Sequence, residues 1–179
     1  MIKLLDILEN KILVLRRSPE ERQKNYLIAT QKKIQQYIKD GSKGDLDLSN
    51  TPIVSLPSDL KVGGYLDLSN TPITSLPSGL NVGGYLYLSN TPITSLPSGL
   101  NVGGDLNLYN TKITSLPSGL NVGGYLYLSN TPITSLPSDL NVGGDLYLEN
   151  TPISKKYSKD EIRKMIKDKG GYVKEDIYI

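Results

Sequence analysis

The sequence predicts an α/β solenoid, in which short coils stack into a parallel β-sheet that is capped at both ends. The main observation is a 20-residue unit that begins at Gly44, occurs five times in tandem and starts a sixth time at Gly144. The flanking segments lack this unit and carry apolar residues at helical spacing instead. One unit buries too few side chains to offset the entropy of its backbone, so the units must stack to be stable.

The first part of each unit has the pattern of a β-strand with one buried face. In the segment from Val82 to Leu88, the apolar residues Val82, Leu86 and Leu88 are separated by even numbers of positions, which places them on one face of a strand. Gly84 falls on the same face, which indicates either a close approach of neighbouring backbones or a tight bend. We therefore expect one strand in each coil, paired in parallel with its neighbours.

The rest of the unit has the residues of a turn and an extended return. Asn90 follows the strand, and Asn tolerates the left-handed conformation that turns often need. The threonines from Thr51 to Thr151, one in each copy, are expected to form a buried ladder of hydroxyl groups. Pro92 and Pro97 prevent a return helix, so the convex side of the solenoid is predicted to be extended and non-helical.

The segment Leu66–Pro77, LDLSNTPITSLP, resembles the leucine-rich repeat, L-x-L-x-x-N-x-L-x-x-L-P, with Thr71 at the usual Asn or Cys. The resemblance covers residues 44–153, and the 20-residue length is similar to the shortest bacterial class. Val62-Gly63-Gly64 replaces the leading leucine of the family. The resemblance implies a curved solenoid, of bacterial or phage origin, that binds protein partners on its strand face. Some relatives carry a cysteine-dependent ubiquitin-ligase domain, which a chain without Cys cannot have.

Residues 1–43 are predicted to form a helical N-terminal cap of two helices. The apolar residues of the first helix are Leu4, Leu5, Leu8, Ile12 and Leu15. A capping box at Ser18–Glu21, with Pro at the first helical position, begins the second helix, which should run to about Lys39 and stop near Gly41. The residues expected to join this helix to the first helix and to the first coil are Leu27, Ile34 and Ile38.

Residues 154–179 are predicted to form a C-terminal cap of one helix and a final strand. A capping box at Ser158–Glu161 begins the helix, and Gly170-Gly171 end it. Its apolar stripe consists of Ile162, Met165 and Ile166. Val173–Ile179 aligns position by position with Val142–Leu148, which favours a final strand over a frayed tail.

The candidate binding residues are the outward positions of the strands, which vary between copies while most of the rest of the unit stays fixed. Seven of the twelve tyrosines lie there. Tyrosine is common at interface centres, although aromatic residues also favour strands and stack along them. The predicted partner-binding residues are Tyr65, Asp67, Tyr85, Tyr87, Asp105, Asn107, Tyr109, Tyr125, Tyr127, Asp145 and Tyr147. The fourth copy departs most, at Asn107, Tyr109 and Lys112, which indicates either an interface centre or drift in one copy.

Charge is unevenly distributed along the chain. Residues 1–43 carry a net charge of +5, residues 44–153 carry −6 and residues 154–179 carry +3. An acidic surface rich in tyrosine prefers a basic protein surface and disfavours nucleic-acid phosphates. We interpret the Lys-rich caps as solvated helix faces, so neither nucleic acid nor a membrane is predicted as a partner.

Most enzyme mechanisms are excluded by composition. Without Cys or His, the chain has no thiolate nucleophile, no imidazole base and no Cys/His zinc site. Asp45, Asp47 and Asp67 could form an acid/base pair or bind a hard cation, but an open sheet lacks the pocket that perturbs a pKa. The Gly-Gly pairs lack the strand-to-helix context of a phosphate loop. We therefore predict no catalytic residue, no metal and no cofactor.

These observations predict a non-enzymatic scaffold that binds a protein as an adaptor or a stoichiometric inhibitor. The alternatives are a structural protein that self-associates through its caps or edges, and a carbohydrate-binding module that uses the tyrosines. Asp6 and Glu9 interrupt the apolar N-terminal segment, which argues against a signal peptide or a membrane span. The expected location is the cytoplasm of a bacterium or of a phage-infected cell.

Overall fold

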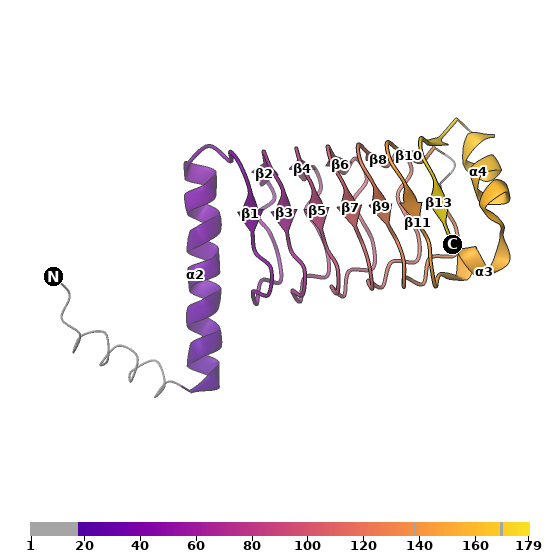
Figure 1. Ribbon diagram of the computed structural model, residues 1–179. Helices are drawn as coiled ribbons and strands as arrows, with labels where there is room; N and C mark the ends of the chain where they lie inside the picture. Colours follow the sequence, from indigo (N-terminus) through magenta and orange to yellow (C-terminus); the bar gives the residue numbers. More distant parts are fainter. Residues whose placement is uncertain (1–17, 138, 169) are drawn as a thin grey trace.

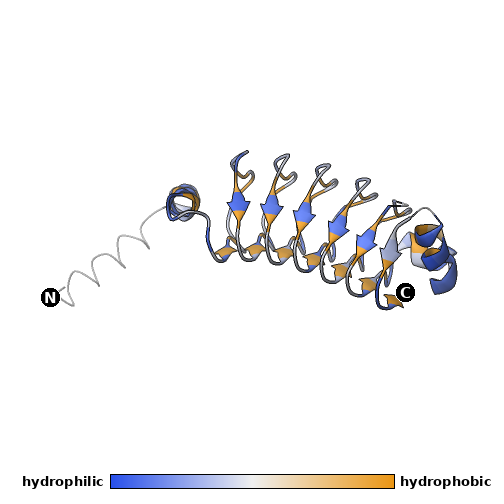
Figure 2. Cartoon of the chain, turned by 90° about the horizontal axis from the view of Figure 1, so that it is seen from above, coloured by the Kyte–Doolittle hydropathy of each residue, from blue (hydrophilic) through white to orange (hydrophobic). Residues whose placement is uncertain are grey.

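The computed structural model describes residues 18–137, 139–168 and 170–179. They form a parallel β-solenoid with helix α2 (Pro19–Lys39) beside its first coil and helices α3 (Pro152–Lys156) and α4 (Lys159–Lys167) at the opposite end (Figure 1). Seen from above, the outer side of α4 is hydrophilic (Figure 2). The predicted fold class is confirmed. The predicted first helix of the N-terminal cap falls in residues 1–17, which lie outside the described residues.

The strands form two parallel sheets. The seven-stranded sheet consists, in spatial order, of β1 (Leu46–Asp47), β3 (Leu66–Asp67), β5 (Leu86–Tyr87), β7 (Leu106–Asn107), β9 (Leu126–Tyr127), β11 (Leu146–Tyr147) and β13 (Ile177–Tyr178). The six-stranded sheet consists of β2 (Lys61–Val62), β4 (Asn81–Val82), β6 (Asn101–Val102), β8 (Asn121–Val122), β10 (Asn141–Val142) and β12 (Tyr172–Val173). The prediction of one strand per coil is therefore wrong, because Val82 and Leu86 belong to different sheets.

Two glycines form the corner between the sheets. The backbone N–H of Gly83 donates to the carbonyl of Val62 (2.8 Å), and that of Gly84 donates to Gly64 (2.9 Å), so the turn keeps its bonds to the preceding coil. A Cβ on Gly84 would lie 2.9 Å from the carbonyl carbon of Gly64. The close approach and the bend, which the sequence offered as alternatives, are therefore both present.

Each coil then turns at an asparagine in the left-handed conformation, as predicted. Asn90 has φ of +58°, and its side-chain amide donates to the amide oxygen of Asn70 (2.9 Å) and accepts from Asn110 (2.8 Å). The threonines differ from the prediction. The Thr71 hydroxyl is buried but donates to the carbonyl of Leu68 in its own coil (2.7 Å), and the later threonines through Thr151 repeat this bond.

One hydrophobic core fills the space between the two sheets and the returning segments. It extends from Ile34 of α2 to Ile177 of β13, and Leu86, Leu88 and Ile93 of the third coil are fully buried within it. The returning segments, such as 91–97, contain no helix or strand, as the prolines predict. Stacked coils therefore share one continuous core.

Helix α2 closes the first coil. Ser18 and Glu21 form the predicted capping box, Ile34 is buried, and Leu27 and Ile38 are partly buried against the core. The helix also covers the free edge of β1 with polar side chains. Their donor–acceptor pairs are Lys33 Nζ to the carbonyl of Asp47, Tyr37 Oη to Gly44 (2.9 Å) and Tyr26 Oη to Asn50 (3.3 Å). The Lys33 bond covers the carbonyl of Asp47 at the edge of β1, whereas the carbonyl of Gly44 also accepts from the backbone N–H of Gly64 (2.6 Å).

The C-terminal cap contains the predicted α4 and also α3, which was not predicted. Thr151 and Ser154 form the capping box of α3, and Ser158 and Glu161 form that of α4. Ile162 and Ile166 are buried, whereas Met165 is 39% exposed, because the nine-residue helix buries mainly its i, i+4 positions.

The predicted final strand is confirmed. Leu146 pairs with Ile177 and Tyr147 with Tyr178, so β13 adds a seventh strand to the larger sheet. In the smaller sheet, Val142 pairs with Val173. The last coil thus replaces the extended return of the earlier coils with α3 and α4.

Candidate protein-binding surface

The predicted binding residues lie together on the outward side of the seven-stranded sheet, which we call the tyrosine surface. One row consists of strand residues in direct pairing register: Asp67, Tyr87, Asn107, Tyr127 and Tyr147. A second row precedes the strands, and its carbonyls accept backbone bonds from the coil before: Tyr65, Tyr85, Asp105, Tyr125 and Asp145. Tyr109 lies farther along the fourth coil, where its carbonyl accepts from Asn90 (3.1 Å). The structure thus brings all eleven predicted residues onto one face.

The tyrosine rings contact one another across the coils. Tyr127 and Tyr147 are stacked with centroids 4.6 Å apart, and Tyr147 and Tyr178 are stacked at 4.8 Å. Within single coils, Tyr85 packs on Tyr87 at 6.1 Å and Tyr125 on Tyr127 at 6.3 Å. Such contacts hold the rings in fixed orientations at little entropic cost, which suits them to binding.

Tyr178 and Asp176 belong to this surface but were absent from the predicted set. Asp176 continues the row of Asp145, because its carbonyl accepts from the backbone N–H of Leu146 (2.9 Å). The alignment of Val173–Ile179 with the preceding copy placed both residues in the tyrosine columns, so the signal was present in the sequence.

The carboxylates on this surface also bind backbone N–H groups. Asp105 Oδ1 accepts from Tyr125 (2.8 Å), Asp145 Oδ1 accepts from Asp176 (2.8 Å), and Asp67 Oδ1 accepts from Ser69 (2.8 Å). The Ser49 N–H likewise bonds to the Asp47 carboxylate and lowers its pKa. A lowered pKa favours the charged form of Asp47, which does not suit a general acid.

In four of the five Gly-Gly pairs, the second glycine makes room for an outward side chain of the preceding coil. A Cβ on Gly104 or Gly144 would overlap the ring of Tyr85 or Tyr125, respectively, in the preceding coil. On Gly124 it would overlap the Asp105 carboxylate. The glycine corner therefore lets these outward side chains lie against the next coil.

Tyr147 is the most perturbed of the tyrosines. Burial and the adjacent Asp145 carboxylate raise its pKa to about 12, from an ordinary value of 10.0. The phenol must lose its proton at lower pH when unfolded, so folding stability should be intact below pH 10 and fall between about pH 10 and 12. Urea unfolding over this pH range should show a smaller loss for Tyr147→Phe than for the wild type. An equal slope in both proteins would contradict the assignment, and Tyr172→Phe, at an exposed position of β12, serves as the control.

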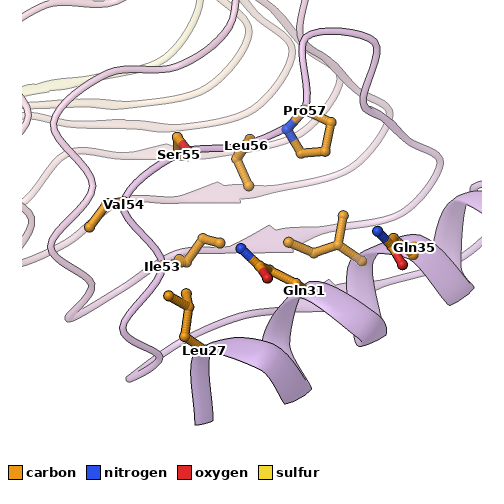
Figure 3. A pocket seen from close by; sticks show the side chains of 9 residues that line it. Leu27, Gln31, Gln35, Ile53, Val54, Ser55, Leu56 and Pro57 are labelled. Carbon is orange, nitrogen blue, oxygen red and sulfur yellow. The ribbon is translucent and has the colours of Figure 1, made fainter. Parts of the chain in front are cut away.

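Hollows lie elsewhere on the molecule. One of about 430 Å³ opens between α2 and the back of the first coil, with Leu27, Ile53 and Leu56 among its apolar walls (Figure 3). Its polar lining side chains are Gln31, Gln35 and Ser55, which carry no charge. None of the described residues that line this hollow carries an ionisable side chain.

Comparison with protein-family models finds no match, and comparison with curated proteins finds no significant match. Over the described ranges, no group of three or more acidic side chains is arranged to hold a metal ion. No helix in the same part of the chain is both long and apolar enough to cross a membrane.

Proposed function

We propose that this chain is a leucine-rich-repeat protein of the short bacterial type that acts in the cytoplasm as a non-enzymatic protein-interaction scaffold. It binds its partner through the tyrosine surface and works as an adaptor or a stoichiometric inhibitor. The observation that carries this proposal is that the repeat copies differ in sequence on the tyrosine surface. The buried leucines and the turn asparagines are the same in the successive coils, whereas residue type changes on the tyrosine surface.

Exposure and charge support the same surface. Tyr85 is 45% exposed, Tyr109 43% and Tyr125 36%, so three large aromatic side chains on one face are accessible to a partner. Residues 44–153 carry eight acidic and two basic side chains, so the surface favours a basic partner. Ordered, amphipathic rings of this kind are typical of binding hot spots.

Replacing Tyr85, Tyr87 and Tyr127 together with alanine should reduce partner affinity at least about a hundredfold, since hot-spot tyrosines each contribute about 2 kcal/mol or more. The measurement is affinity capture from lysate of the native host, followed by titration of the purified partner against wild type and variant. Circular dichroism checks that the variant remains folded.

The matched control replaces Tyr26 and Tyr172, which are also exposed but lie on α2 and on the smaller sheet. The proposal requires this control to bind like the wild type. A partner retained equally by the triple variant would move the function to the caps and overturn the proposal.

A further inference from the structure

The fourth coil, whose sequence departs most from the others, lies at the centre of the tyrosine surface. Its strand β7 is the middle strand of the seven-stranded sheet (Figure 1). Both neighbouring coils carry a pair of tyrosines at the positions that Asp105 and Asn107 occupy in the fourth coil. Hot spots cluster near the centres of interfaces, so this position favours an interface centre over drift.

Asp105 is therefore a carboxylate with aromatic side chains on both sides. Tyr85 and Tyr87 lie in the coil before it, and Tyr125 and Tyr127 lie in the coil after it. The charge of Asp105 raises the pKa of both Tyr87 and Tyr127, after burial in each case, which places both phenols within its field. At about 4.8 Å per strand, the two tyrosine pairs stand about 9.6 Å apart.

Part of the Asp105 carboxylate is available to a ligand. Oδ1 accepts from the Tyr125 backbone, and within the described ranges no hydrogen bond reaches Oδ2 and no cation lies within 4.0 Å of the group. Asp145 differs, because one of its oxygens accepts from Asp176 and the other accepts from the Tyr147 hydroxyl (3.3 Å). Asp105 thus combines flanking rings with unused acceptor capacity.

The same surface already binds a cation of its own chain. At its C-terminal end, the Lys159 ammonium group lies 5.3 Å from the ring centroid of Tyr178, in the range of a cation–π contact. Arg163 pairs with Asp176 nearby, at 3.7 Å. The rings and carboxylates of this surface are therefore arranged to bind positive groups.

We propose that Asp105 binds an arginine side chain of the partner, with the guanidinium group between the tyrosine pair of the third coil and that of the fifth. Guanidinium is planar, stacks on aromatic rings and is weakly hydrated, which suits this position better than the compact ammonium of lysine. This inference rests on the proposed function, because it names the chemistry that the tyrosine surface recognises.

The test uses a fluorescein-labelled octapeptide of alternating glycine and arginine, and a second peptide in which citrulline replaces arginine. Fluorescence anisotropy should show binding of the arginine peptide only. Asp105→Asn keeps the acceptor for Tyr125 but removes the charge, and it should weaken binding about tenfold. Asp45→Asn is the matched control, because Asp45 makes the same backbone bond, to Tyr65 (2.9 Å), without a preceding tyrosine pair. It should change affinity less than about twofold.

Equal weakening by Asp105→Asn and Asp45→Asn would indicate only a general charge effect and would overturn the inference. Equal binding of the citrulline peptide would also overturn it. If the triple tyrosine variant loses the natural partner while the wild type ignores the arginine peptide, the inference fails and the proposed function stands. If the peptide binds at Asp105 but the triple variant keeps its partner, the proposed function fails, and Asp105 is an arginine site that this partner does not use.

Discussion

Gly123→Ala should destabilise the protein by more than about 3 kcal/mol, a large effect for the addition of one methyl group. The new Cβ would lie less than 3.0 Å from both the carbonyl oxygen and the carbonyl carbon of Gly103 in the preceding coil. Both are backbone atoms, so no side chain can rotate away to make room. The coils would have to separate at this point, which weakens the hydrogen bonds that join them.

Urea unfolding followed by circular dichroism measures this effect. Gly119→Ala is the control, because Gly119 has φ of +70° but no atom within 4 Å of an added Cβ. Its cost is conformational only, at about 1–2 kcal/mol. If the two variants lose the same stability, close packing of the glycine corners does not hold the coils together.

Leu106→Ala should cost about 3–5 kcal/mol, the range for truncation of a well-packed buried leucine. Leu106 is fully buried in β7, with Leu86 and Leu126 paired to it on either side. A solenoid is stabilised by contacts between neighbouring coils, so a cavity in the central coil weakens two interfaces at once.

Leu136→Ala is the matched control, since Leu136 belongs to the same core but is only partly buried. Its cost in urea unfolding should be less than half that of Leu106→Ala. Hydrogen exchange should also show faster opening of the amides of β5 and β9 in the Leu106 variant. Unchanged exchange there would contradict coupling between neighbouring coils.

Much of the fold could be predicted from the sequence because every coil repeats the same local signals. The period fixed the pairing of Leu86 with Leu106, and each Asn supplied a residue able to adopt positive φ. The capping boxes at Ser18 and Ser158 marked where two helices begin. These signals depend on neighbours in sequence, which a single chain displays directly.

The division into two sheets could not be predicted, because the alternation of buried and exposed residues is the same in a straight strand and in one that bends. Val82, Leu86 and Leu88 point inward whether the chain runs straight or turns at two glycines between them. Helix α3 was missed for a related reason, because five residues are too few to show helical periodicity.

For the candidate site, the columns of outward residues were predictable and their contacts were not. The alternation of each strand placed Tyr127 and Tyr147 on one face, but the stacking of their rings depends on side-chain rotamers. The unused oxygen of Asp105 and the occupied oxygens of Asp145 likewise follow from hydrogen bonds to the next coil and, at Asp145, from the hydroxyl of Tyr147 in the same coil. Asp145 is followed by Tyr147 and Asp105 by Asn107, but the sequence alone does not show that the Tyr147 hydroxyl donates to Asp145.

The separation of caps from coils also makes the molecule adjustable in length. The hydrogen bonds from α2 side chains to the solenoid go to residues 44–63, and α4 packs against β12 and β13. Unequal recombination between near-identical gene segments can add or remove whole 20-residue units, and neither cap would lose its own contacts. Each such event changes the distance between the caps by about 4.8 Å. The span of this protein can therefore change in evolution only in fixed increments.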